Sequence, residues 1–171
     1  MGLFDFLKKK EEAPAPAEVT WPVVVSADAK GKVFKMEDVP DPVFSQGVLG
    51  FCCGVDPKEG KVYAPLDGKV TQFVDSKHAI GLECPGGIEL LIHVGVDTVE
   101  MNGNGFKGKV KEGDVVAKGQ LLLEVDLDKV KAAGHETTVI MAVTNTDDFA
   151  AVELTAEGEV AVGENILKIS K

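Results

Sequence analysis

The residues with the most distinctive chemistry are two histidines, His78 and His93, on either side of the Pro-Gly-Gly sequence 85–87. Two imidazoles could bind zinc if Asp97, Cys84 or a residue of a partner protein completed the ligand set. The spacing matches no HxH or HExxH motif, so we expect no metal site of the protein's own. The alternative is phosphoryl transfer, in which one neutral imidazole attacks phosphorus and the second histidine donates a hydrogen bond to the phosphoryl oxygens.

The residues around His93 follow the pattern of a half-buried β-strand. Apolar residues recur at every second position of 88–96, share one face and should enter the core: Ile88, Leu90, Ile92, Val94 and Val96. His93 belongs to the other face. We therefore expect its side chain to lie outside the main core.

The loop length of the hairpin decides whether His78 reaches the face that carries His93. A two-residue turn at Gly86-Gly87 makes the histidines diagonal neighbours, with Cα atoms roughly 7–8 Å apart. A four-residue loop over 84–87 places them directly opposite each other, whereas a three-residue loop places them on opposite faces. Most of the simple registers thus predict a histidine pair.

Two small residues could complete such a pair. A helper histidine needs its tautomer fixed by a hydroxyl or a carbonyl group. Ser76 lies two residues before His78, on the same side of an extended strand, and could supply the hydroxyl. Gly95, beside His93, should leave room for a ligand or for a partner's backbone.

Short apolar runs separated by Gly, Pro and Asp fill the chain from about Val23, which is typical of an antiparallel β-sandwich or barrel. Two short helical interruptions are plausible. Residues 126–134 could form one, with Asp126 or Asp128 as cap and Gly134 as stop. Residues 147–154 are the second and weaker candidate. We expect one domain over 23–171, preceded by a flexible tail.

Composition excludes several classes of protein. The formal net charge of -10 argues against nucleic-acid binding. All positive charges are lysines, so a phosphate site would lack the arginine fork, and no GxxxxGK[ST] loop replaces it. No apolar run is long enough for a membrane span, and no secretory signal is recognisable. The cysteines Cys52, Cys53 and Cys84 lack metal-ligand spacing, so we expect buried, reduced thiols in a cytoplasmic protein.

The first 22 residues differ from the rest. Leu3, Phe4, Phe6 and Leu7 precede three lysines, and a proline-alanine linker follows. We expect a flexible tail in solution. Residues 1–10 could also contact anionic lipid weakly, with apolar groups inserted and lysines at the headgroups.

Several motifs occur together in order: DVPDPVFSQGVLG, APLDGKV, SKHAIGLE, GIELLIHVGVDTVEMNGNGF and VKEGDVVAKGQ. From about residue 24 to the C-terminus the chain resembles the glucose-family IIA component of the bacterial phosphoenolpyruvate:sugar phosphotransferase system. The resemblance implies a small antiparallel β-sandwich in the cytoplasm, with peripheral contact at the inner face of the membrane. It implies a monomeric phosphocarrier without a cofactor.

The same resemblance implies roles for individual residues. His93 would carry the phosphoryl group on Nε2, receiving it from the phosphohistidine of the carrier protein HPr. It would pass the group to a cysteine on the IIB domain of a sugar-specific IIBC permease. His78 would stabilise the phosphoryl group and Ser76, in place of the usual threonine, would orient His78. Asp97 would position a partner or the local backbone, and Val94 stands where many members have phenylalanine.

The resemblance also implies that partners dock on a shallow apolar surface around the histidines, and that the protein binds regulatory targets. The matching candidates are Val43, Phe44, Val48, Leu49, Val74, Leu91 and Val99. An apolar surface would exclude water when a partner docks, which strengthens hydrogen bonds to the phosphoryl group.

Two other readings compete. The half-motifs GKVYAPLDGKV and VKEGDVVAKGQLLLEVDLDKV resemble biotinyl and lipoyl carrier domains, with Lys129 near the modified position. A carrier lysine belongs at a tight turn, however, and Lys129 precedes a helical pattern. The second is a purely regulatory binding module, which overlaps with the phosphocarrier. His135 is expected in a surface loop.

Overall fold

The computed structural model describes residues 19–171. The expected lipid-contacting segment 1–10 and nearly all of the tail lie outside the described residues. The first strand, β1, begins at Val23. No helix of the described part is both long and apolar enough to cross a bilayer.

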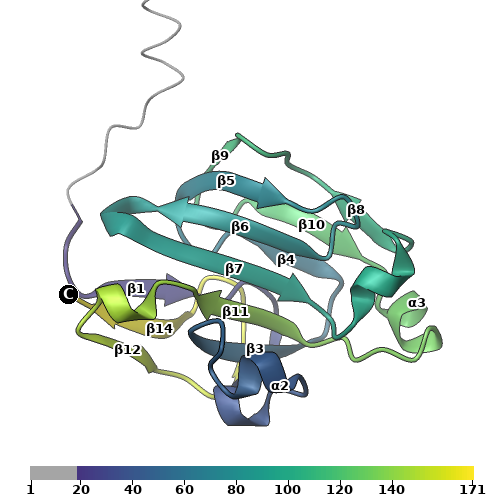
Figure 1. The fold of residues 1–171 in the computed structure, drawn as a ribbon, viewed down its shortest axis with the longest axis horizontal. Coiled ribbons are helices and arrows are strands. Elements are labelled where there is room, and N and C mark those ends of the chain that lie inside the picture. Colours follow the sequence, from purple (N-terminus) through teal and green to yellow (C-terminus); the bar gives the residue numbers. More distant parts are fainter. Residues whose placement is uncertain (1–18) are drawn as a thin grey trace, which may run out of the picture.

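Three antiparallel sheets form the fold (Figure 1). The largest has eight strands in the order β13-β2-β3-β11-β7-β6-β5-β9. Its strands are β2 (Gly31–Lys35), β3 (Phe51–Pro57), β5 (Gly68–Phe73), β6 (Ala79–Cys84), β7 (Ile88–Val94), β9 (Val115–Val116), β11 (Val139–Val143) and β13 (Gly158–Val160). The expected all-β antiparallel sandwich is confirmed.

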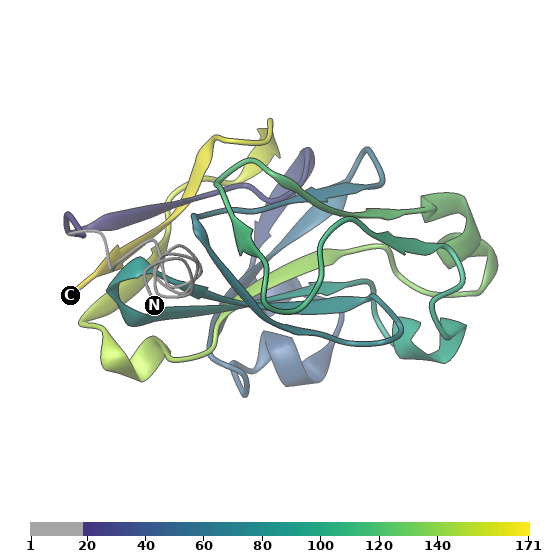
Figure 2. The same ribbon diagram turned by 90° about the horizontal axis from the view of Figure 1, so that it is seen from above.

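The two smaller sheets have three strands each, and both lie against the same face of the large sheet (Figure 2). One has the order β1-β14-β12, with β1 (Val23–Ser26), β12 (Ala151–Leu154) and β14 (Asn165–Ser170). The other has the order β4-β10-β8, with β4 (Lys61–Tyr63), β8 (Phe106–Gly108) and β10 (Leu121–Val125). The layers are therefore closed by short strands, which keeps exposed sheet edges short.

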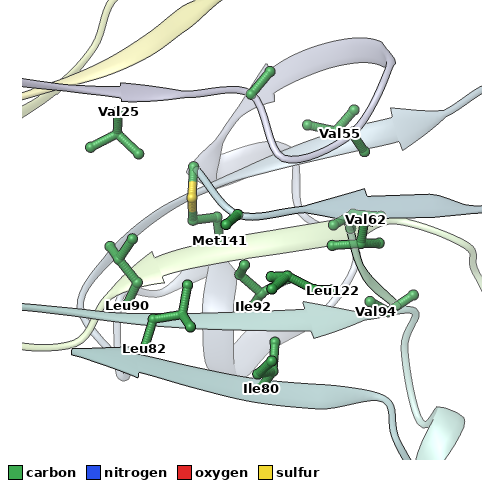
Figure 3. Close-up of a cluster of buried hydrophobic side chains, with 14 of the residues drawn as sticks. Val25, Val55, Val62, Ile80, Leu82, Leu90, Ile92, Val94, Leu122 and Met141 are labelled. Atoms are coloured by element: carbon green, nitrogen blue, oxygen red, sulfur yellow. The ribbon is translucent and has the colours of Figure 1, made fainter. Parts of the chain in front are cut away.

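The main core lies between these layers and draws side chains from all three sheets (Figure 3). Val25 of β1, Leu122 of β10 and Ile92 of β7 meet there and are each 0% exposed. A buried side chain of this size contributes about 1.5–3 kcal/mol by its removal from water. The predicted alternation of β7 is confirmed as far as Val94; Val96 lies beyond the strand end and is only half-buried.

A second, smaller cluster covers the outer face of the large sheet, where the short helix α2 (Pro42–Ser45) packs. It contains Val39, Phe44, Cys52, Ile140 and Ala142, with Phe34, Met36 and Leu91 packed against it. Figure 2 shows α2 projecting from this side of the sheet, away from the small sheets. The outer face of β7 therefore faces a thin apolar layer rather than bulk solvent alone.

The expected helices are partly confirmed. Helix α3 (Leu127–Ala132) has Asp126 as N-cap, whose side chain accepts from the Lys129 N–H, and Gly134 follows at φ +86. The second candidate, 147–154, is wrong. A 3₁₀ turn, η4 (Thr146–Asp148), ends before Phe149, and the rest forms β12, because pairing with β14 satisfies its backbone.

Helix α2 was not expected, although the sequence carries its signal. Asp41 is the N-cap, its side chain accepts from the Val43 N–H, and Pro42 occupies the first helical position. Aspartate followed by proline is a common helix start. The remaining 3₁₀ turns are η1 (Met36–Asp38), η2 (Pro85–Gly87) and η3 (Thr98–Met101).

Candidate functional site

His93 lies near the end of β7 on the outer face of the large sheet. Its Cα partner on β11 is Ile140, a member of the outer cluster. The Phe44 ring of α2 lies with its centroid 5.2 Å from that of the imidazole, at an interplanar angle of 53°. Nδ1 of His93 is fully buried and has no hydrogen-bond partner among the described residues. Nε2 is not among the buried atoms that lack a partner.

The hairpin register differs from both registers that predicted a histidine pair. Cys84 pairs with Ile88 and Ala79 pairs with His93, so the loop has three residues, Pro85–Gly87. In a regular hairpin of this length His78 would lie on the face opposite His93. The two rings nevertheless meet, with centroids 5.1 Å apart and an interplanar angle of 81°.

A turn before β6 resolves this conflict. His78 precedes the first residue of the strand, Ala79, and strand alternation does not govern it. Lys77 has φ +62, in the left-handed region that bulky residues seldom adopt. The turn redirects the His78 side chain, while its carbonyl oxygen still accepts from the Val94 N–H at 2.7 Å.

Ser76 contacts His78 as expected. Its Oγ lies 2.7 Å from Nδ1 of His78. If the hydroxyl donates, Nδ1 is the acceptor and the proton of the neutral ring lies on Nε2. His78 is 8% exposed, so this bond orients a ring that solvent barely reaches.

Burial favours the neutral form of both rings. Burial, followed by the neighbouring His93, lowers the pKa of His78. Burial also lowers the pKa of His93, against smaller opposing effects of the Gly95 backbone and of the carboxylates of Asp41 and Asp97. A neutral imidazole with one unprotonated nitrogen is the form that can attack phosphorus.

Gly95 does not provide the open space that we expected beside His93. It follows β7 at φ +79, and a Cβ there would lie 2.4 Å from Cγ2 of Thr98. The glycine is required by the turn and by close packing. Its backbone lies near enough to the His93 ring to favour ring protonation, although the contact falls outside full hydrogen-bond geometry.

The expected docking residues divide into two groups. Four are exposed large hydrophobic residues: Val43 at 46%, Val48 at 67%, Leu49 at 37% and Val99 at 53%. The first three belong to α2 and its following turn, and Val99 belongs to η3; both elements project from the same side of the large sheet (Figure 2).

The other three expected docking residues are less exposed. Phe44 is only 4% exposed, so its ring packs beside His93 and cannot be contacted directly by a partner. Leu91 is half-buried and packs on the outer cluster. Val74 is half-buried in the turn that carries Ser76, where its N–H donates to Ala79.

Asp97, by contrast, is exposed, with φ 58 at the start of η3.

Two residues that influence the histidine site were not predicted from the sequence. Asp41 acts on His93 from the α2 cap, and the Asp-Pro signal could have located that cap. Thr98 is 0% exposed behind the turn, and nothing in its spacing indicates this.

The other residues that the sequence singled out for their chemistry are His135, Lys129 and the three cysteines. Nε2 of His135 is 3.8 Å from Oε2 of Glu100, and its side chain is 13% exposed, so it is more buried than expected for a surface loop. Lys129 lies within α3 and not at a tight turn, which disfavours a carrier domain. The three cysteines are buried and free. The described residues contain no cluster of three or more potential metal ligands.

Comparison with known proteins agrees with this geometry. Residues 23–149 match the family described as phosphoenolpyruvate-dependent sugar phosphotransferase system, EIIA 1. The chain is similar to the glucose-specific EIIA component of Halalkalibacterium halodurans, with 42% identity over 160 residues that cover 94% of this chain and 90% of that protein. It is 38% identical over 170 residues to the β-glucoside-specific EIIBCA component of Bacillus subtilis, covering 99% of this chain and 28% of that protein.

A solved structure gives the same result. Glucose permease IIA from Mycoplasma capricolum has a TM-score of 0.78 and 30% sequence identity, covering 87% of this chain and 96% of that one. The chain therefore belongs to the EIIA family of the phosphoenolpyruvate-dependent sugar phosphotransferase system and is a phosphotransferase component that carries phosphoryl groups between proteins.

Proposed function

We propose that His93 is the residue that carries the phosphoryl group, on Nε2. The observation that supports this most directly is the edge-on approach of the His78 ring to the His93 ring, with Ser76 bonded to the far nitrogen of His78. Nδ1 of His93 is buried, which leaves Nε2 as the nitrogen that a phosphoryl donor can reach.

The transfer requires two in-line substitutions at phosphorus. The lone pair on Nε2 of neutral His93 attacks the phosphorus of phospho-HPr; the new N–P bond forms as the donor's N–P bond breaks, and that electron pair returns to the donor imidazole. A cysteine thiolate of the IIB domain then attacks the same phosphorus, and the pair of the His93 N–P bond returns to the ring. His78, with its proton on Nε2, donates to the phosphoryl oxygens of phosphorylated His93 as the group leaves for the IIB cysteine. The fused B. subtilis relative carries IIB, IIC and IIA parts in one chain by name, which supports IIB as the acceptor.

A phosphorylation assay tests the assignment of His93. Incubation with phosphoenolpyruvate, enzyme I and HPr should add about 80 Da, acid-labile and base-stable, to the wild type. His93→Gln should take up nothing. His135→Gln removes the histidine outside the pair and is the matched control, expected to accept normally. Phosphate uptake by His93→Gln would contradict the assignment.

We place the docking of HPr and IIB on the exposed apolar residues beside the site: Val43, Val48, Leu49 and Val99. Val48→Glu should raise the KM for phospho-HPr about tenfold, because a charge is brought into an apolar contact, while kcat changes less. Val115→Glu is the control, since Val115 is also exposed, at 50%, and lies on β9, an edge strand of the large sheet. Equal KM values for the two variants would argue against this surface.

We place the protein in the cytoplasm, as the family implies, with the segment 1–10 contacting anionic lipid weakly. Val19 and Trp21 lie beside Gly86, at the turn end of the β6–β7 hairpin, whereas His93 lies near its other end. The described residues that follow the tail therefore lie at the end of the hairpin away from His93. Deletion of residues 1–12 should abolish co-sedimentation with anionic liposomes; unchanged binding would contradict this.

A further inference from the structure

The turn after β7 is held by three short hydrogen bonds that converge on two successive peptide groups. The Val94 N–H donates to the His78 carbonyl at 2.7 Å, and the Gly95 N–H donates to the Thr138 carbonyl at 2.7 Å. The third bond comes from a side chain: Oγ1 of Thr98 donates to the Val94 carbonyl at 2.6 Å. The Val94 residue thus links the backbone of one histidine to the hydroxyl of Thr98.

Thr98 also contacts this turn through its methyl group. A Cβ on Gly95 would lie 2.4 Å from Cγ2 and 3.3 Å from Oγ1 of Thr98, so the threonine side chain packs directly against the Gly95 Cα. Thr98 is 0% exposed, and therefore neither the hydroxyl nor the methyl group can exchange its partner for water. One buried side chain holds the turn at both Val94 and Gly95.

The position of Gly95 matters because its backbone lies beside the His93 ring and favours the protonated ring. Nδ1 of His93 is fully buried and has no partner with full hydrogen-bond geometry in the described residues. A neutral imidazole places its proton on the nitrogen that finds an acceptor, and the other nitrogen keeps the lone pair. A backbone acceptor held close to Nδ1 would keep the proton there and leave the lone pair on Nε2.

We propose that Thr98 is a positioning residue for phosphoryl transfer: it holds the Val94–Gly95 turn so that the Gly95 carbonyl keeps the His93 proton on Nδ1 and leaves Nε2 nucleophilic. This rests on the proposed role of His93 as phosphoryl carrier. Thr98 itself touches neither phosphorus nor the attacking nitrogen. Its two contributions are separable, since serine keeps the hydroxyl and valine keeps the shape.

The test compares Thr98→Val with Thr98→Ser. Loss of the hydroxyl leaves the buried Val94 carbonyl without this donor, and the turn should relax. We expect Thr98→Val to accept phosphate from phospho-HPr about tenfold more slowly, the change expected when one buried hydrogen bond is lost. Nitrogen-15 NMR of the His93 ring at pH 8 should show a larger fraction of the tautomer protonated on Nε2. Thr98→Ser should restore the wild-type tautomer and a rate within about threefold.

Thr146→Val is a matched control for a purely structural effect. Oγ1 of Thr146 donates to the Val143 carbonyl at 2.5 Å, at the end of β11 away from the histidines, and it also accepts from the Phe51 N–H at 2.9 Å. We expect this variant to lower the midpoint of thermal unfolding without changing the His93 tautomer. If Thr98→Val also changed only thermal unfolding, with tautomer and rate as in the wild type, the positioning role would be wrong.

The His93→Gln assay separates this proposal from the one on which it rests. If His93→Gln still takes up phosphate, the carrier assignment fails, and the ring tautomer still reports whether Thr98 controls the turn. If His93→Gln is inactive and Thr98→Val keeps the wild-type tautomer, only the role of Thr98 fails.

Discussion

In the part of the chain that the structure describes, two regions bury polar side-chain atoms without a hydrogen-bond partner, and the consequences are opposite. One is the histidine site, where Nδ1 of His93 is unpaired. The other is the end of β1, where Ser26 Oγ and both carboxylate oxygens of Asp28 are unpaired among the described residues. Such groups are rare in folded proteins and each needs a physical account.

Burial shifts both groups toward their neutral forms. Asp28 is 0% exposed, and burial raises its pKa to about 7, against a smaller opposing effect of the backbone. At His93 burial lowers the pKa. The same physical cause therefore removes a charge at both places.

The surroundings make the difference. The His93 ring lies beside the rings of His78 and Phe44, and two carboxylates act on its pKa. Its Nδ1 is buried and unpaired among the described residues, whereas Nε2 is not. Neutrality there produces a nucleophile. Around Asp28 the backbone is bonded, with its carbonyl accepting from the Tyr63 N–H at 2.7 Å, but no described residue hydrogen-bonds to the carboxyl oxygens. Neutrality there only lessens the cost of burial. Removing Asp28 should therefore change stability alone, and removing site residues should change transfer.

Asp28→Ala is expected to give the largest effect. The carboxyl pKa is raised from its ordinary value of 3.8 to about 7 in the fold, so between pH 4 and 7 the unfolded chain ionises while the folded protein does not. The free energy of unfolding of the wild type should therefore fall by about 4 kcal/mol as the pH rises from 4 to 7. It should not fall further above pH 7 on account of Asp28. The variant should not show this loss.

Urea unfolding at pH 4, 6 and 8 measures the effect of Asp28→Ala. At pH 4, the difference in free energy of unfolding between Asp28→Ala and the wild type gives the cost of the small cavity. The change in that difference between pH 4 and pH 8 gives the effect of ionising Asp28. Asp56→Ala, which removes an exposed carboxylate from β3, is the control. Parallel stability curves for Asp28→Ala and wild type would remove the contrast between the two regions.

His78→Gln should show the converse: a large loss of transfer with little change in stability. This substitution removes the imidazole donor beside the phosphoryl group, and loss of one such preorganised donor slows transfer by roughly 10²–10³-fold. Uptake from phospho-HPr should still occur, but transfer to a IIB domain should fail. Rapid-quench assays of both half-reactions measure this, and wild-type transfer to IIB would contradict it.

Ser76→Ala would make His78 resemble Asp28, because Nδ1 of a largely buried ring would lose its partner. We expect transfer to IIB to slow about tenfold, since the tautomer is no longer held by one hydrogen bond. Ser76→Thr keeps the hydroxyl and should transfer at close to the wild-type rate. If alanine and threonine variants transferred equally, Ser76 would have no orienting role.

The smallest expected effect is a displacement on the pH axis. Because burial lowers the pKa of His93, NMR titration of the ring should give a midpoint below the ordinary value of about 6.5. Phosphate uptake should be constant above that midpoint and decline only as the pH falls through it. The stability change from Asp28 runs in the opposite direction, with loss as the pH rises toward 7. A ring midpoint above 6.5 would show that the carboxylates, and not burial, dominate at His93.

Much of this fold could be predicted because local rules suffice for it. Alternation placed His93 on the outer face of β7, and the expected cap, Asp126 or Asp128, with Gly134 indicated the extent of α3, whose N-cap is Asp126. The segment 147–154 was wrongly predicted as a helix, because its apolar spacing does not reveal that β14 supplies hydrogen-bond partners for its backbone. The apolar residues Val43, Val48, Leu49 and Val99 were located through motifs, but only the fold distinguishes them from buried Phe44.

By itself, then, the sequence determined the strand that presents His93, the all-β architecture and the family to which the chain belongs. Only the tertiary structure decided that His78 reaches His93, since alternation ends with the strand and a turn at Lys77 redirects the side chain despite the three-residue loop. It also decided that Asp28 and Thr98 are buried, because burial depends on contacts between segments distant in sequence. Pairing inside a strand is a local property, whereas the position of a side chain beyond its end depends on everything packed around it.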